Sequence, residues 1–281
     1  MDKTKKHICL VDGSTYIFRA YHALPPLTRK SDGFPVGAIS GFCNMLDKLV
    51  KEEKEKKGIT NLLVVFDASG KTFRNDIYPD YKANRSEAPE DLIPQFPVIR
   101  KATEAFNIPY VELIGYEADD LIASYSRAAQ KENMKVTIVS SDKDLMQLVS
   151  DNVSMLDTMK NKIVQKGEVY EKFGVYPEKV IDVQSLAGDS VDNIPGVPGI
   201  GIKTAALLIN EYGNLDGLFK NAESIKQKKR RENIIEFEEQ AYLSKKLVTL
   251  RDDVPLPIPI QETGLKDLSL IHISEPTRQS L

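Results

Sequence analysis

Three short apolar runs in this 281-residue chain are each followed by aspartate within three residues. Residues 8–11 precede Asp12, residues 62–66 precede Asp67, and residues 136–139 are followed by Asp142 and Asp144. Runs of this length and composition are typical of buried strands. In an open α/β sheet the carboxyl ends of parallel strands meet at one edge, where such sheets place their sites. The pattern therefore predicts an acidic site at that edge.

A fourth group of acids, Glu117, Asp119 and Asp120, lies within four residues at the start of a helical apolar pattern. In a helix Glu117 and Asp120 would share a face, with Asp119 displaced around the axis. Taken alone, acids in a first turn are what an ordinary helix N-terminus contains, because the helix dipole favours them there. The acids at the three strand ends favour a shared site instead.

Clustered carboxylates cannot all stay ionised without cations between them. Because hard oxygen ligands without His or Cys favour Mg²⁺ or Mn²⁺ over zinc, we expect two such ions, in the arrangement used for in-line displacement at phosphorus. The sequence thus predicts a metal-dependent phosphodiesterase. The candidate metal ligands are Asp12, Asp67, Glu117, Asp119, Asp120, Asp142, Asp144, Asp189 and Asp192.

The formal net charge of −3 does not exclude a nucleic-acid partner. Setting the nine candidate ligands aside leaves 38 basic and 32 acidic side chains, enough positive charge to hold phosphates. The apolar runs are too short to span a membrane, and no signal peptide is recognisable at the start. Two unpatterned cysteines, Cys9 and Cys43, suggest a reducing cytoplasm.

Strand and helix patterns alternate through residue 144, which predicts a mostly parallel sheet flanked by helices. We expect an α/β core over 1–165, a helical subdomain over 166–253 and a proline-rich extended spacer over 254–267. Residues 268–281 resemble a translated sequencing adapter and are set aside as non-native.

Residues 71–89 have no clear core periodicity and interleave aromatic side chains with Lys and Arg directly after an acid-tipped strand. Cations that hold phosphates and rings that stack on bases are how single strands are bound. We therefore interpret this stretch as a mobile element that orders around a threaded strand, although an ordinary surface loop is the alternative.

A glycine-rich turn over 186–204 leads into a helix that extends to about residue 210. Glycines permit a tight turn, and free amides at a helix start bind phosphate. The basic run at 226–231 is equally consistent with a solvated helix face and with a contact to a nucleic-acid backbone.

Together the motifs at 10–14, 65–68, 117–120, 141–144 and 188–196 resemble the 5′-nuclease family, and within it the 5′→3′ exonuclease domain at the N-terminus of bacterial DNA polymerase I. The resemblance covers about residues 6–260. It implies a PIN-like core with two divalent metals, the first held by the acids up to Asp120 and the second by Asp142, Asp144, Asp189 and Asp192. Asp119 and Asp142 are our candidate catalytic carboxylates.

The resemblance further implies that 71–89 is a helical arch. In it Lys82 and Arg85 would face the scissile phosphate as catalytic cations, Tyr81 would stack on a base, and Arg74 and Arg19 would contact phosphates. The glycine-rich turn would be a helix–three-turn–helix that holds duplex DNA with the help of K⁺. Its contact residues would be Gly196, Gly199, Gly201, Lys203 and Thr204.

The expected function is cleavage of 5′ flaps, 5′ ends and nicks in DNA, and of RNA primers paired to DNA, by a monomer in the cytoplasm. A polymerase domain would follow C-terminally in the intact protein. One alternative is a standalone exonuclease of the same family. Another is a non-catalytic DNA-binding scaffold, which would not need nine acids.

Overall fold

A computed structural model describes residues 6–266, and its centre is a six-stranded sheet in the order β3-β2-β1-β4-β5-β6. All neighbouring strands are parallel except β5 and β6, which form an antiparallel hairpin. The expected mostly parallel sheet is confirmed. The strands are β1 (His7–Asp12), β2 (Asn61–Val65), β3 (Tyr110–Val111), β4 (Lys135–Val139), β5 (Val153–Asp157) and β6 (Lys162–Val164).

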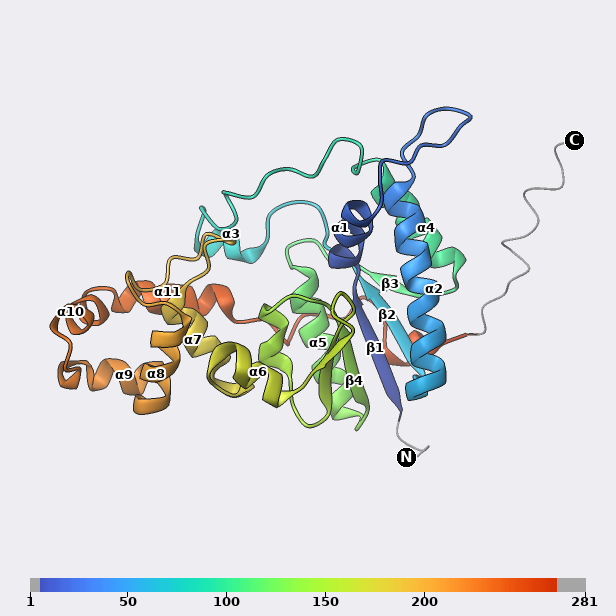
Figure 1. Cartoon of the computed structure of the whole chain (residues 1–281). Helices are drawn as coiled ribbons and strands as arrows, with labels where there is room; N and C mark the ends of the chain where they lie inside the picture. Colours follow the sequence, from blue (N-terminus) through green and yellow to red (C-terminus); the bar gives the residue numbers. More distant parts are fainter. Residues whose placement is uncertain (1–5, 267–281) are drawn as a thin grey trace, which may run out of the picture.

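Helices cover both faces of the sheet because side chains alternate along each buried strand. On β1, Ile8 and Leu10 pack in one core with α5 (Ala118–Lys131), whereas Cys9 and Val11 pack in a second core. That second core is closed by α1 (Gly13–Ala23), α2 (Gly37–Lys57) and α4 (Gln95–Ala105) (Figure 1).

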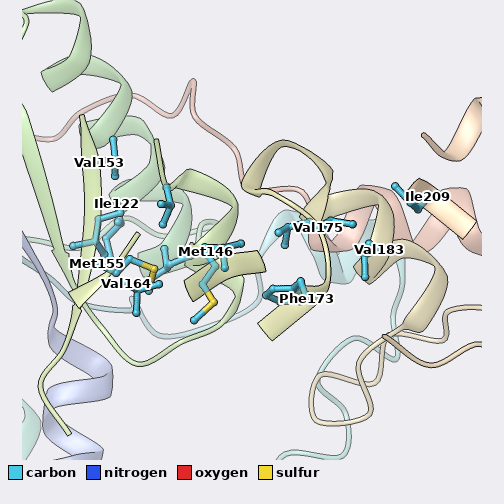
Figure 2. Packing of buried hydrophobic residues seen from close by; sticks show 14 of the residues in the cluster. Ile122, Met146, Val153, Met155, Val164, Phe173, Val175, Val183 and Ile209 are labelled. Atoms are coloured by element: carbon cyan, nitrogen blue, oxygen red, sulfur yellow. The ribbon is translucent and has the colours of Figure 1, made fainter. Parts of the chain in front are cut away.

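From residue 166 to Val248 the chain is mostly helical, with short 3₁₀ turns between some of the helices. Its helices pack on one another at one side of the sheet (Figure 1). Figure 2 shows that Met155 and Val164 of the sheet belong to the same apolar cluster as Phe173, Val183 and Ile209 of the helices. One continuous core therefore fixes the helical part against the sheet. The helices are α6 (Lys166–Phe173), α7 (Val180–Ala187), α8 (Ile202–Tyr212), α9 (Leu215–Lys220), α10 (Lys228–Glu236) and α11 (Glu238–Val248).

The segment between β2 and α4 runs from the sheet to the helical part and back (Figure 1). It contains one short helix, α3 (Phe73–Ile77), and then turns through residues 79–84. Lys82 has a φ of 57°, a left-handed conformation that a lysine adopts only when surrounding contacts hold it. Its backbone amide donates to the carbonyl of Asp192, 3.0 Å away, so the arch rests on the turn that follows α7.

The expected extended spacer packs against the sheet instead of standing free. Val254 and Ile260 are buried in the main core, and Tyr125 Oη donates to the carbonyl of Ile258. A bridge between Asn61 and Gly264 attaches the segment beside β2. Proline alternation predicted an extended segment, and residues 251–259 have neither helix nor strand, but the alternation could not reveal the apolar partners. The proposed adapter tail, 268–281, lies outside the described residues. Within residues 6–266 no helix is both long and apolar enough to cross a membrane.

Candidate active site

Seven carboxylates converge on one cavity of about 590 Å³ at the carboxyl edge of the sheet. They come from the ends of β1 and β2, the start of α5, the loop after β4 and the turn after α7. An adjoining cavity of about 320 Å³ adds Asp189 and shares three of the seven. The convergence predicted from the sequence is thus present in the fold. The seven are Asp12, Asp67, Glu117, Asp119, Asp142, Asp144 and Asp192.

Asp12 is the most firmly held of these carboxylates. It caps α1 by accepting from Thr15 N at 2.9 Å, and its other oxygen accepts from Ser140 Oγ at 2.7 Å. Burial nevertheless raises its pKa to about 6, which the hydrogen bonds from Thr15 and Ser140 only partly offset. The protein therefore holds Asp12 at a fixed place where its charge is poorly solvated.

Two further acids are oriented by the beginning of α5. Asp67 Oδ1 accepts from Ala118 N at 2.8 Å, so this carboxylate from the end of β2 is placed by the first amide of the helix. Glu117 is the residue before the helix and points its carboxylate toward the arch, where Lys82 Nζ lies 2.6 Å from its Oε1. The two acids thus reach the cavity from neighbouring elements.

Asp119 and Asp144 are both buried and both feel the negative charge of Asp142. Burial raises the pKa of Asp119 well above its usual value, and the charge of Asp142 adds to that increase. Burial and Asp142 likewise raise the pKa of Asp144 to about 7. Acids whose charges are this poorly compensated favour binding of a cation.

Basic and amide groups of the protein partly compensate these charges. Arg85 donates to Asp192, Lys143 Nζ lies 2.5 Å from Asp189 Oδ2, and Gln184 donates to Asp144. Among residues 6–266, no three acidic, His or Cys side chains lie close enough together to form a preassembled metal site. The donor set consists of carboxylate oxygens, and the pKa values of Asp12, Asp119 and Asp144 are raised; it nevertheless fits a hard divalent cation.

Two predicted site residues form a structural pair instead. Asp120 is fully buried, lines neither cavity and binds the guanidinium of Arg74 with both oxygens. Asp120 is therefore not placed to serve as a metal ligand. Arg74 contributes to the wall of the larger cavity, but its guanidinium is already bound by Asp120, so it is not placed as a free phosphate contact. At this position the interpretation as an ordinary helix N-terminus was correct, because Asp120 Oδ2 accepts the amide of Glu117.

Two more expectations fail because the groups are already engaged. Tyr81 contributes to the wall of the acidic cavity but is only 5 % exposed and packs with Ile194, Leu247 and Val248, so most of its ring is already covered by the protein. Gly196 is buried and donates its amide to Ser244 Oγ at 3.0 Å, so that amide cannot bind phosphate. Gly196 instead allows its backbone to pass close to that of Gly188, since a Cβ at position 196 would lie 2.4 Å from Gly188 N.

The rest of the glycine turn is open to solvent. Gly199, with a φ of 76°, and Gly201 are exposed, and Gly201 directly precedes α8. Lys203 is exposed and Thr204 half-buried in the first turn of that helix, where backbone amides lack partners within the helix. Arg19 lines the acidic cavity but donates to the carbonyl and hydroxyl of Thr158. For these five residues, contact with DNA stays a prediction.

Sequence reasoning missed the side chains that orient the acids. Ser140 bridges two strand ends, because it donates to Asp12 and accepts from the amide of Asp142 at 3.0 Å. Lys143 could have been noticed between Asp142 and Asp144. Gln184 gave no signal, since a lone glutamine in a helical pattern is ordinary; only the fold brings it to Asp144.

Comparisons with known proteins agree with this geometry. The family model for the 5′-3′ exonuclease N-terminal resolvase-like domain matches residues 7–174, and that for the C-terminal SAM fold matches 175–270. The chain is 59 % identical over 267 residues to a DNA polymerase I of Rhizobium leguminosarum, covering 94 % of this chain and 26 % of that protein. It is 43 % identical to a 5′-3′ exonuclease of Aquifex aeolicus, covering 98 % and 92 % of the two chains.

Among solved structures, the bacteriophage T5 D15 flap endonuclease in complex with DNA and metal ions superposes with a TM-score of 0.74. It is 25 % identical, and the match covers 88 % of this chain and 90 % of that one. An acid-lined cavity at the carboxyl edge of a parallel sheet, joined to a helical subdomain, defines a class of nucleases. This chain belongs to the 5′-3′ exonuclease family. It spans about a quarter of its DNA polymerase I relative and nearly all of the exonuclease from Aquifex.

Proposed function

We propose that this chain is a metal-dependent 5′→3′ exonuclease and 5′-flap endonuclease that hydrolyses phosphodiester bonds in DNA and in RNA primers paired to DNA. The observation that carries the proposal is the set of seven carboxylates around one cavity, three of them with raised pKa values. The T5 flap endonuclease, which shares the fold, was solved with DNA and metal ions.

We assign two divalent ions to two groups of these acids. Asp12, Asp67, Glu117 and Asp119 would hold the first, and Asp142, Asp144, Asp189 and Asp192 the second. Mg²⁺ is the expected ion and Mn²⁺ its substitute, because the donors are all carboxylate oxygens. When bound, such ions lower the pKa of the attacking water and neutralise negative charge on the phosphoryl oxygens.

The arch supplies the cations that face these acids. Lys82 and Arg85 line the same cavity as the carboxylates, so a phosphate held between the two groups would meet both positive charges. Fixed cations stabilise the charge that develops on a phosphoryl group in the transition state. Their present partners are Glu117 and Asp192, two of the acids that would hold the ions. When metal ions and substrate bind, Glu117 and Asp192 would bind the ions, and Lys82 and Arg85 would be released to bind the phosphate.

The exposed end of α8 is where the duplex would bind. Gly199 and Gly201 let a DNA backbone approach closely, and Lys203 and Thr204 place donors beside the unpartnered amides. A K⁺ ion at this turn is part of the proposal. Arg19, at the edge of the acidic cavity, is the remaining candidate phosphate contact.

The similarity to DNA polymerase I supports a polymerase domain joined C-terminally in the intact protein, and the similarity to the Aquifex exonuclease supports a standalone enzyme. In either form we propose a cytoplasmic monomer that acts on 5′ flaps, nicks and RNA primers. A DNA-binding scaffold without activity would differ in one respect, since divalent ions would not trigger cleavage.

The test is cleavage of a 3′-labelled duplex carrying a 5′ flap, with Mg²⁺ and with EDTA. Cleavage near the flap junction that requires the metal and leaves 5′-phosphate ends is expected. Asp119→Asn should abolish it, whereas Asp252→Asn, an exposed carboxylate paired with Arg127 and absent from both cavities, should not. Binding of the flap without cleavage under every metal condition would show that the chain is a scaffold.

A further inference from the structure

Arg74 and Asp120 form a two-pronged ion pair inside the protein. Arg74 Nη1 lies 2.7 Å from Asp120 Oδ2, and Nη2 lies 2.8 Å from Oδ1. The side chains are 1 % and 0 % exposed; Arg74 contributes to the wall of the acidic cavity, but its guanidinium is taken up by Asp120, and Asp120 lines neither cavity. A fully desolvated pair of this kind is retained only where the geometry is good and the remaining donors and acceptors have partners.

The pair joins three segments that are distant in sequence. Arg74 lies on α3 at the base of the arch, and Asp120 lies in the first turn of α5. Arg74 Nε donates to the carbonyl of Leu247 at 2.8 Å, and the amide of Arg251 donates to Asp120 Oδ1 at 2.9 Å. The arch base, α5 and the end of α11 are thus fixed to one another at this point.

The same pair contacts both the backbone amide and the side-chain carboxylate of Glu117. The backbone amide of Glu117 donates to Asp120 Oδ2 at 3.1 Å, and Arg74 Nη1 lies 3.3 Å from Glu117 Oε2. Glu117 lines the acidic cavity, whereas Asp120 does not. Asp120 therefore fixes the backbone of Glu117 just before α5, and Arg74 fixes the direction of its carboxylate.

We propose that Arg74 and Asp120 are a positioning pair that aligns Glu117 for the cleavage reaction, and that they touch neither metal nor DNA. The proposal rests on the proposed nuclease function. It predicts that losing either partner misplaces one carboxylate while the remaining acids and the DNA-binding surface stay intact. A displacement of about 1 Å in a site of this kind costs roughly a hundredfold in rate.

The experiment compares Arg74→Lys, Asp120→Asn and the double variant in single-turnover cleavage of a 5′ flap at saturating enzyme. Arg74→Lys keeps the buried positive charge but loses the two-pronged contact, so it is expected to fold even if removing the charge does not allow folding. Each single variant should lose roughly tenfold to a hundredfold in rate at saturating Mg²⁺. The double variant should be no slower than the slower single one, because both act through Glu117.

Two further readouts separate positioning from direct contact. If Asp120 were a metal ligand, Asp120→Asn alone would raise the Mg²⁺ concentration needed for half-maximal rate. If Arg74 contacted phosphate, Arg74→Lys would weaken flap binding and change its salt dependence. The proposal requires a lowered rate with unchanged flap binding in both variants. Because Glu117 is itself a proposed ligand of the first ion, any rise in the half-maximal Mg²⁺ concentration must be the same in Arg74→Lys and Asp120→Asn. A rise confined to Asp120→Asn, or weaker flap binding in Arg74→Lys, would overturn it.

Tyr125→Phe is the matched control for loss of stability. Tyr125 lies on the same helix, and its hydroxyl joins α5 to the backbone of Ile258, away from Glu117. At a temperature where all variants are folded, Tyr125→Phe should cleave at the parental rate. Equal losses in Tyr125→Phe would show that the pair only stabilises the fold. Cleavage by the unmodified chain tests the proposed function separately, since its absence would refute that function whatever the variants do.

Discussion

The ammonium group of Lys82 lies 2.6 Å from Oε1 of Glu117, and its other acidic neighbour, Asp192 Oδ2, is 3.7 Å away. A single arch lysine thus faces an acid from each of the two groups assigned to metal ions. The left-handed backbone of Lys82 and the bond from its amide to the carbonyl of Asp192 hold it there. This contact places a cation at the centre of the proposed reaction.

Lys82→Ala should slow cleavage far more than it weakens binding. The charge of Lys82 matters most when negative charge develops on the phosphoryl group, so a loss of roughly 10²–10³ in single-turnover rate is expected. Single-turnover kinetics and flap binding measured in parallel check this. Lys71→Ala removes an exposed lysine from the same segment and should leave the rate unchanged. If Lys82→Ala changes only the dissociation constant, the arch is a docking surface and not part of the catalytic machinery.

The metal-free protein should lose stability as the pH rises from about 4 to about 7. In the folded state the pKa of Asp12 is about 6 and that of Asp144 about 7, against about 4 in the unfolded chain. The folded state therefore binds protons more tightly, and deprotonation favours unfolding by an amount on the order of a few kcal/mol. Denaturant unfolding in EDTA at pH 5 and pH 7.5 measures this.

Asp144→Asn should flatten the dependence of stability on pH, because it removes one of the two raised pKa values. Addition of Mg²⁺ at pH 7.5 should restore stability to the parent by compensating the ionised acids. A stability in EDTA that rises between pH 5 and pH 7.5 would contradict the raised pKa values.

The main features of the fold were predictable because they depend on local patterns. Continuous apolar runs at 8–11, 62–66 and 136–139 identified β1, β2 and β4. The convergence of acids was also predictable, since it follows from strand direction alone.

The assignments of Arg74, Asp120 and Tyr81 failed for a common reason. Each looks like a site residue by composition, and each is buried by segments distant in sequence. Arg74 and Asp120 meet each other and the end of α11, and Tyr81 meets Leu247 and Val248. Burial by a distant helix leaves no periodic signal in the stretch that it covers.

Tyr81 should act through stability and alignment rather than stacking. Its hydroxyl donates to Glu117 Oε2 at 3.2 Å, so Tyr81→Phe should cost about 0.5–1.5 kcal/mol. Tyr81→Ala should cost about 3–5 kcal/mol through loss of a buried ring. Thermal and denaturant unfolding without DNA measure both effects. If Tyr81→Ala were as stable as the parent but bound single strands more weakly, Tyr81 would stack on a base after all.

Gly201→Val should weaken duplex binding without damaging the fold. A Cβ at Gly201 meets no atom within 4 Å, so the free protein can accommodate the side chain. DNA that approaches the turn closely could not. Gly167→Val, also at a position with nothing within 4 Å, is the control for the loss of a glycine. We expect weaker binding of duplex flaps, with cleavage of short single strands less affected. Equal losses on the two substrates would mean that the turn does not hold the duplex.

The central claim is that the acidic cavity cleaves DNA with bound metal ions. Asp142 donates its amide to Ser140 Oγ and accepts the amide of Asp144 at 2.9 Å, contacts that an asparagine can keep. Asp142→Asn should therefore fold, and in EDTA it should be at least as stable as the parent because a like charge is removed. The decisive measurement is single-turnover flap cleavage by Asp142→Asn across a Mg²⁺ titration. The account predicts near-complete loss at every concentration, and cleavage at the parental rate by this variant would contradict it.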